Sequence, residues 1–168
     1  MQLIIDGYNL LHVDRSLINL HSLQLQQERE GLINRLSAYQ KLKRCDVTLV
    51  FDGWEGGWSS ETREKRKGIE IIFSRLGEKA DEVIKRLVRG AGSGAIVITS
   101  DRDVARFAER MAVAVIPSER FREKLGEGCF DGFEKSSEEE EESGVKKKGP
   151  SRRLSKKEKR ARAALKKM

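Results

Sequence analysis

Short apolar runs recur along the first two thirds of the chain, separated by polar and charged stretches. Each run is apolar at consecutive positions and rich in Val or Ile, a pattern typical of parallel strands that helices cover on both faces. The pattern predicts five strands, at residues 3–5, 47–51, 69–73, 95–99 and 112–116.

Apolar residues between these runs recur instead at helical spacing. The first predicted helix spans about residues 20–43 and has on one face Leu25, Leu32, Leu36 and Tyr39. A second spans residues 80–89, with a stripe of Ala80, Val83, Ile84, Leu87 and Val88. A third follows Asp101 and turns inward Val104, Ala105, Ala108 and Met111. The alternation predicts a three-layer α/β domain with a central parallel β-sheet and right-handed crossovers.

Charge divides the chain into two parts. From Glu134 onward there are 13 of the 34 Lys and Arg residues and 7 of the 27 Asp and Glu residues, which leaves 21 and 20 before it. An acidic block and then a basic stretch cannot bury enough apolar surface to offset chain entropy. We therefore predict a domain over residues 1–130 and a disordered tail over 131–168. Ser155 and Glu158 form a capping box, so one short basic helix within that tail could form on a polyanion.

The two cysteines, Cys45 and Cys129, have neither the spacing of a zinc site nor the number expected of a disulfide framework. No apolar run approaches the 18 residues of a membrane span, and no signal-peptide pattern opens the chain. These features predict a soluble protein of the reducing cytoplasm without a membrane partner. They leave its oligomeric state open.

Acidic residues lie where the predicted strands end. The candidates are Asp6, Asp52, Asp101 with Asp103, and, in the helix after the third strand, Asp81. Ligands of open parallel sheets bind beyond this carboxyl edge. Any one of these residues taken alone is better explained as a helix cap. Together, however, the carboxylates repel one another unless a cation or protons neutralise them.

Helix phase separates Asp81 from its neighbour Glu82. Successive residues of a helix are about 100° apart, so Asp81 falls at the rim of the apolar stripe and Glu82 falls in solvent. Asp81 is therefore the better candidate ligand. Oxygen ligands without a companion Cys or His cluster favour Mg²⁺ or Mn²⁺ over zinc.

Four short motifs also stand in a characteristic order: Ile5-Asp6-Gly7-Tyr8-Asn9-Leu10-Leu11, Val50-Phe51-Asp52-Gly53, Ala80-Asp81-Glu82-Val83-Ile84 and Ile98-Thr99-Ser100-Asp101-Arg102-Asp103. Together they resemble the YacP-like branch of the NYN domains, relatives of the PIN ribonucleases, over roughly residues 1–125. The resemblance implies a PIN-like fold and Mg²⁺-dependent hydrolysis of RNA through a metal-activated water, which leaves 5′-phosphate and 3′-hydroxyl ends. It further implies, in bacteria, a role on translating ribosomes.

The same resemblance implies roles for individual residues. Asp6, Asp81 and Asp101 would bind the metal, and Asn9 would orient Asp6 or contact a phosphate. Asp52 and Asp103 are further candidates, although Asp52 could instead cap the turn at Gly53. The chain has Lys79 where the family usually has Thr, and this lysine would either bind phosphate or pair with Asp81 and weaken metal affinity.

Aromatic and basic residues after the second strand suggest how RNA is held. Trp54 and Trp58 flank two glycines and precede a basic cluster, a combination suited to stacking on unpaired bases. The alternative is that a Trp packs on the core while the charges are solvated. Residues 59–61 could start a short helix that places Arg63 and Lys67 on one face. The predicted RNA contacts are Trp54, Trp58, Arg63, Arg66, Lys67, Lys79 and Arg102, with added salt-sensitive affinity from the tail.

The predicted function is therefore a metal-dependent RNA endonuclease. The first alternative is a catalytically weak RNA- or ribosome-binding module with the same fold. A phosphatase or phospho-acceptor domain also carries acidic strand ends, but Asp6-Gly7-Tyr8 lacks the DxD nucleophile motif of the phosphatases.

Overall fold

The computed structural model describes residues 1–13, 22–53, 59–92, 94–130, 159–161 and 163–164. Its strands are β1 (Gln2–Asp6), β2 (Asp46–Phe51), β3 (Thr62–Arg66), β4 (Ile69–Phe73), β5 (Ala95–Ile98) and β6 (Ala114–Ile116). Its helices are α1 (Gly7–His12), α2 (Ser22–Lys43), α3 (Ala80–Gly90), α4 (Arg102–Arg110) and α5 (Ser118–Phe130). Each of the five predicted strands and the three long predicted helices has a counterpart in this order.

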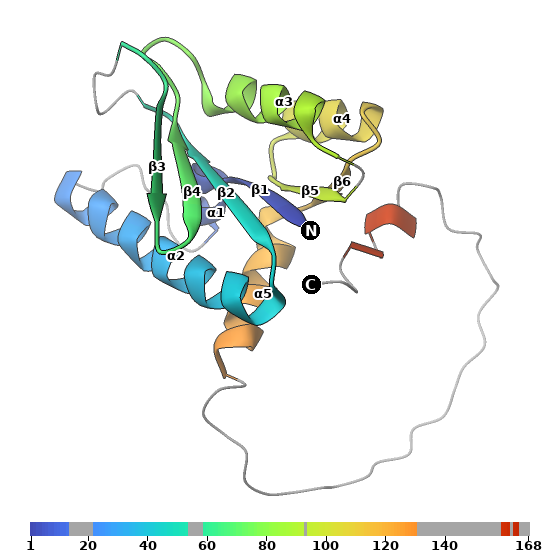
Figure 1. The fold of residues 1–168 in the computed structure, drawn as a ribbon, viewed down its shortest axis with the longest axis horizontal. Helices are drawn as coiled ribbons and strands as arrows, with labels where there is room; N and C mark the ends of the chain where they lie inside the picture. Colours follow the sequence, from blue (N-terminus) through green and yellow to red (C-terminus); the bar gives the residue numbers. More distant parts are fainter. Residues whose placement is uncertain (14–21, 54–58, 93, 131–158, 162, 165–168) are drawn as a thin grey trace, which may run out of the picture.

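The six strands form one sheet in the order β3-β4-β2-β1-β5-β6 (Figure 1). Every neighbouring pair is parallel except β3 with β4. Buried side chains of α1, α2 and α5 pack on one face of the sheet, and those of α3 and α4 pack on the other. The three-layer α/β fold predicted from the sequence is therefore confirmed.

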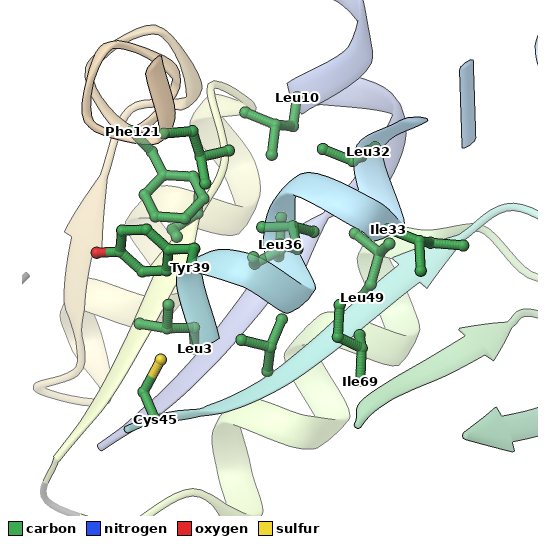
Figure 2. Close-up of a cluster of buried hydrophobic side chains, with 14 of the residues drawn as sticks. Leu3, Leu10, Leu32, Ile33, Leu36, Tyr39, Cys45, Leu49, Ile69 and Phe121 are labelled. Atoms are coloured by element: carbon green, nitrogen blue, oxygen red, sulfur yellow. The ribbon is translucent and has the colours of Figure 1, made fainter. Parts of the chain in front are cut away.

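Alternation along the strands divides the core between these two faces. Leu3 and Ile5 point toward α2, whereas Ile4 between them points toward α3 and α4. Figure 2 shows the larger cluster, in which Leu36 and Tyr39 of α2 lie over the sheet. All four residues predicted for the inner face of this helix are buried. The predicted apolar face of α2 is thus confirmed.

The segment before β4 was predicted wrongly. A short helix was expected to begin near residues 59–61, but Thr62–Arg66 is a strand that pairs antiparallel with β4. Lys67 and Gly68 both have positive φ, 52° and 90°, as the two central residues of a type I′ hairpin turn require. Arg63 and Lys67 consequently do not share a helix face.

Two further details of the expected elements were also wrong. Met111 was expected to point inward, but it follows the last turn of α4 and its side chain is 45% exposed. The last strand begins at Ala114 rather than at Ala112, because Ala112 has a φ of 61°, which no strand residue adopts.

The sequence pattern did not predict α1 or α5. Helix α5 carries the buried pair Phe121 and Leu125 at i, i+4 spacing, a signal too short to stand out.

Most of the predicted tail lies outside the described residues, so its predicted disorder stays a prediction. Residues 159–161 and 163–164 are helical, and Ala164 is buried in the cluster beneath α2 and α5. Among the helices that the structure describes, none is both long and apolar enough to cross a membrane.

Candidate active site

The carboxylate of Asp6 lies at the carboxyl end of β1, where the chain turns directly into α1. Its Oδ1 accepts a hydrogen bond from the Asn9 backbone N–H at 3.1 Å, which caps the helix. Its Oδ2 accepts from the Asn9 side-chain amide at 2.5 Å and from the Thr99 hydroxyl at 3.2 Å. These bonds fix the orientation of a side chain that is only 3% exposed. The expectation that Asn9 orients Asp6 agrees with this geometry.

The ionised form of Asp6 is nevertheless destabilised. The pKa of Asp6 is raised from 3.8 to about 6, chiefly by burial and to a smaller extent by the negative charge of Asp81, while the hydrogen bonds from Asn9 and Thr99 act against this shift. A carboxylate held in place but poorly neutralised needs a proton or a cation.

Thr99 joins two of the predicted ligands and was missed in the sequence. Its hydroxyl donates to Asp6 and accepts the backbone N–H of Asp101 at 3.1 Å, a combination that one hydroxyl can satisfy. Asp101 in turn caps α4, since its Oδ1 accepts from the backbone N–H groups of Asp103 and Val104. Asp101 therefore has the capping role considered above, and in the described part of the chain its Oδ2 has no hydrogen-bond partner.

Asp81 is the second residue of α3, as predicted, and its side chain is half-buried while that of Glu82 is exposed. Burial raises the pKa of Asp81 and the charge of Asp101 adds to the effect, whereas Lys85 and Lys79 lower it. Glu82 pairs with Lys85 at 2.9 Å. The helix-phase argument is thus confirmed for burial, and its functional meaning stays a prediction.

Asp52 has a structural role in this arrangement. Its Oδ1 accepts the backbone N–H of Ala80 at 2.6 Å, which supplies the cap that Lys79, at the N-cap position of α3, does not provide. The expected cap at Gly53 is wrong, because the Gly53 N–H bonds instead to the hydroxyl of Ser74. A Cβ on Gly53 would lie 1.7 Å from the Ser74 carbonyl oxygen, so only glycine fits there.

The two charged residues of the first turn of α4, Arg102 and Asp103, are exposed. The charge of Asp103 contributes to a raised pKa of Lys85. Asp103 and Lys85 therefore lie at the outer side of the group formed by Asp6, Asp81 and Asp101, which we call the acidic cluster. Lys85 is a second cation beside Asp81, after Lys79, and the sequence did not single it out.

The chemistry of this donor set fits a divalent cation. Asp6, Asp81 and Asp101 offer only oxygen atoms, which Mg²⁺ and Mn²⁺ prefer. The first two have raised pKa values that a positive charge would lower. Within the described residues, however, no three acidic, His or Cys side chains already stand close enough together to hold a metal ion.

Lys79 and Arg102 lie at the starts of α3 and α4, and the other five predicted RNA contacts divide into two groups. Trp54 and Trp58 lie outside the described residues. The cations of the β3 hairpin are engaged, because Arg63 pairs with Glu61 and Glu70, Arg66 pairs with Glu30 and Glu64, and Lys67 bonds to Asn34. Arg66 pairs in register with Ile69, at the end of the sheet away from the carboxylates. The hairpin cations are thus spread along the edge strand instead of gathering beside the acidic cluster.

Comparison with known proteins identifies similar chains. A model of the YacP-like NYN domain matches residues 3–167 and so extends beyond the resemblance noted in the sequence, into the charged segment. "Uncharacterized protein YacP" of Bacillus subtilis (strain 168) is 31% identical over 104 residues, or 59% of each chain. The match thus spans about three fifths of that relative.

Two solved structures have a similar fold. The crystal structure of Rae1 (YacP) from Bacillus subtilis has a TM-score of 0.59 at 24% identity over 79% of each chain. A crystal structure of a mutant of the same protein has a TM-score of 0.60 at 23% identity, over 75% of this chain and 77% of the other. Since the family model spans nearly the whole sequence, this protein belongs to the YacP-like NYN domain family, within a nuclease-like superfamily.

Proposed function

We propose that this protein is a metal-dependent RNA endonuclease. The observation that carries the proposal is the convergence of Asp6, Asp81 and Asp101, three carboxylates far apart in the sequence, at one edge of the sheet. Two of them have pKa values raised by burial and mutual repulsion. Such a cluster costs stability, and perturbed carboxylates of this kind are typical of functional sites.

Each residue of the cluster has a defined part in the proposed reaction. Asp6, Asp81 and Asp101 would hold Mg²⁺ or Mn²⁺, which when bound supplies an activated water and positive charge at the leaving oxygen. Asn9 and Thr99 hold the carboxylate of Asp6 in one orientation. Lys79 and Lys85 keep positive charge beside Asp81, where RNA phosphate would otherwise meet only acidic groups. Asp103 would support the cluster from its outer side.

The proposed substrate is RNA, and the family resemblance extends the proposal to mRNA on translating ribosomes in the cytoplasm. Trp54, Trp58, Arg63, Arg66, Lys67 and Arg102 remain candidate RNA contacts. Because the hairpin cations are already paired with acidic groups, we expect their individual contributions to be small.

Cleavage of a single-stranded and of a structured RNA in the presence of Mn²⁺ or Mg²⁺ tests the proposal. Asp6→Asn and Asp81→Asn should each lower the rate at least about 100-fold, because outer-shell partners of a metal already contribute about 10- to 100-fold. Glu82→Gln is the matched control, since it removes the neighbouring exposed charge, and it should retain activity within about threefold. Full activity of either Asp variant would remove that residue from the site.

The second candidate is a binding module that keeps the fold but does not cleave RNA. The two lysines that lower the pKa of Asp81 favour it, because they partly replace the charge of a metal. Titration with Mn²⁺ distinguishes the candidates. A nuclease should gain thermal stability from the ion and cleave RNA, whereas the binding module should bind RNA equally well with a chelator present.

A further inference from the structure

Three aromatic rings and one arginine form a compact group beside the acidic cluster. Tyr8 comes from α1, Phe51 and Phe73 are the last residues of β2 and β4, and Arg29 comes from α2. The rings of Tyr8 and Phe51 meet edge to face at 5.2 Å between centroids, and those of Phe51 and Phe73 stack at 5.7 Å. We call these four residues the Arg29 cluster.

The guanidinium of Arg29 is held rigidly within this group. Its Cζ lies 5.3 Å from the ring centroids of both Tyr8 and Phe51 and 5.8 Å from that of Phe73, and its Nη2 donates to the Tyr8 hydroxyl. These distances are within the range of cation–π attraction. The planar group is therefore oriented in advance, so little side-chain entropy would be lost when it binds an anion.

The position of the Arg29 cluster ties it to the candidate active site. Tyr8 follows Asp6 by two residues, which limits their Cα atoms to a separation of about 7.6 Å. Phe51 directly precedes Asp52 at the end of β2. A Cβ on Gly7 would lie 2.3 Å from the Phe51 ring, so the ring packs directly against the backbone that follows Asp6. The cluster thus adjoins the backbone after Asp6 at the carboxyl edge of the sheet, on the face that α2 covers, while Asp81 reaches the same edge from α3 on the other face.

The group also reaches the protein surface. Phe51 is fully buried, but Tyr8, Arg29 and Phe73 are only half-buried. An oriented arginine with exposed ring surface beside an acidic cluster has the features of a site for a nucleotide, which offers one anionic phosphate and one flat base.

We propose that the Arg29 cluster binds the nucleotide of single-stranded RNA that adjoins the cleaved phosphodiester. Arg29 contacts the phosphate of that nucleotide, and the exposed ring surface of Tyr8 and Phe73 stacks on its base. This subsite rests on the proposed function, since it assigns RNA to the same edge. It offsets the repulsion between the carboxylates and the RNA backbone with one fixed positive charge.

Binding of a fluorescent single-stranded oligoribonucleotide to the full chain tests the subsite, in Ca²⁺ to supply a divalent ion without Mg²⁺ or Mn²⁺. Arg29→Gln should weaken binding about tenfold and lower the slope of log affinity against log salt by about 0.7, as the loss of one single-strand phosphate contact requires. Lys41→Gln is the matched control, because it removes one exposed positive charge from the same helix at its opposite end. It should change the affinity less than twofold.

Two conservative variants keep the test decisive if Arg29→Gln does not fold. Arg29→Lys retains the charge but loses the planar fork, and Tyr8→Phe retains the ring but loses the hydroxyl that holds Arg29. Each should weaken binding about threefold while its melting temperature stays close to that of the wild type. Affinity and salt slope equal to those of Lys41→Gln in the folded variants would overturn the proposal.

The outcome is separable from that of the proposed function. If cleavage depends on Asp6 while the Arg29 variants bind and cleave as the wild type does, the subsite is wrong and the enzyme stands. If the Arg29 variants lose RNA affinity while no metal supports cleavage, the subsite stands and the enzyme is wrong. Absence of any RNA binding by the wild-type chain would overturn the subsite directly.

Discussion

At the carboxyl edge of the sheet, the ends of strands and the starts of helices bring together charged groups that the fold neutralises poorly, whereas the amino edge at β5 and β6 is covered in part by apolar C-terminal residues. Asp6 and Asp81 at the first edge have raised pKa values. At the second edge, Ala164 from the C-terminal helical residues is buried in the core. Ala163 and Ala164 there line a cavity of about 430 Å³ with the starts of β5 and β6.

The difference indicates that the two ends of the strands have different roles. Apolar burial at the amino edge stabilises the fold, while the carboxyl edge retains groups whose mutual repulsion lowers stability. Residues that destabilise a fold persist where activity requires them. Substitutions of the carboxylates at the carboxyl edge should therefore lower activity without lowering stability, and substitutions at the amino edge should lower stability without lowering activity.

The largest expected effect is the pH dependence that Asp6 confers on the metal-free protein. Its pKa is about 6 in the folded chain, against 3.8 ordinarily. The folded state therefore holds this proton more tightly, and the stabilisation from protonation is lost as pH rises from about 4 to about 6. Above pH 6 the unfolding free energy should be lower by about 3 kcal/mol than in the fully protonated protein, and by about 2 kcal/mol than at pH 4.5. Urea unfolding in a chelator at pH 4.5 and pH 7.5 measures this.

Asp6→Asn should remove this pH dependence and raise stability at pH 7.5 by up to about 3 kcal/mol. Asp46→Asn provides the control, since Asp46 is an exposed carboxylate at the start of β2, on the amino edge. Mn²⁺ at a hundredfold excess over its Kd should stabilise the wild type by about 2.7 kcal/mol and the Asp6→Asn variant much less. Equal pH profiles for wild type and Asp6→Asn would contradict the raised pKa.

The next effect belongs to the amino edge. Ala164→Arg should lower the unfolding free energy by about 1–3 kcal/mol, because a large charged side chain does not fit a buried alanine site. Cleavage per folded molecule should stay within about twofold, since the site lies at the other edge. Ala163→Arg is the matched control, because this neighbouring residue is exposed and tolerates the same change. Equal thermal stability of both variants would show that the C-terminal residues do not contribute to the core.

The contrast between the edges also explains what the sequence could predict. The parallel strands were recognisable because each is an apolar run, and the side of α3 that carries Asp81 followed from helix phase alone. Strand β3 was not recognisable, since Thr62–Arg66 is wholly polar and its pairing depends on the positive φ angles of Lys67 and Gly68. An edge strand of this kind has no apolar face to reveal it.

The hydrogen bonds of the candidate site depend on contacts that no local pattern encodes. Thr99 donates a hydrogen bond to Asp6, which is 93 residues away in the sequence, and Asp52 accepts one from the backbone N–H of Ala80, which is 28 residues away. The sequence placed these carboxylates at one edge through the strand-end rule, but it could not distinguish a ligand from a cap. To tell a metal ligand from a helix cap, one must know which group each carboxylate oxygen binds. These partners are what distinguish Asp52, which caps α3, from Asp6.

A smaller effect is expected for Thr99, whose hydroxyl joins Asp6 to the Asp101 backbone. Thr99→Val keeps the shape of this buried side chain but leaves the Asp101 N–H without its acceptor, so stability should fall by about 1–2 kcal/mol. Cleavage should fall about 10- to 100-fold, as for other partners that orient metal ligands. Thr99→Ser should restore both quantities. Unfolding curves and cleavage rates of both variants test this prediction. If Thr99→Val lowered stability but left the cleavage rate unchanged, the role of Thr99 would be purely structural.

The smallest effect is expected for Asp52, which lies at the carboxyl edge but serves the fold. Asp52→Ala removes the acceptor of the Ala80 N–H and should cost about 0.5–2 kcal/mol, the range of a lost helix cap. Asp52→Asn keeps an acceptor oxygen and should retain most of that stability. Because a cap does not need a charge, cleavage by the Asn variant should stay within about threefold of wild type. A loss comparable to that of Asp6→Asn, with stability intact, would instead place Asp52 among the metal ligands and extend the acidic site to the end of β2.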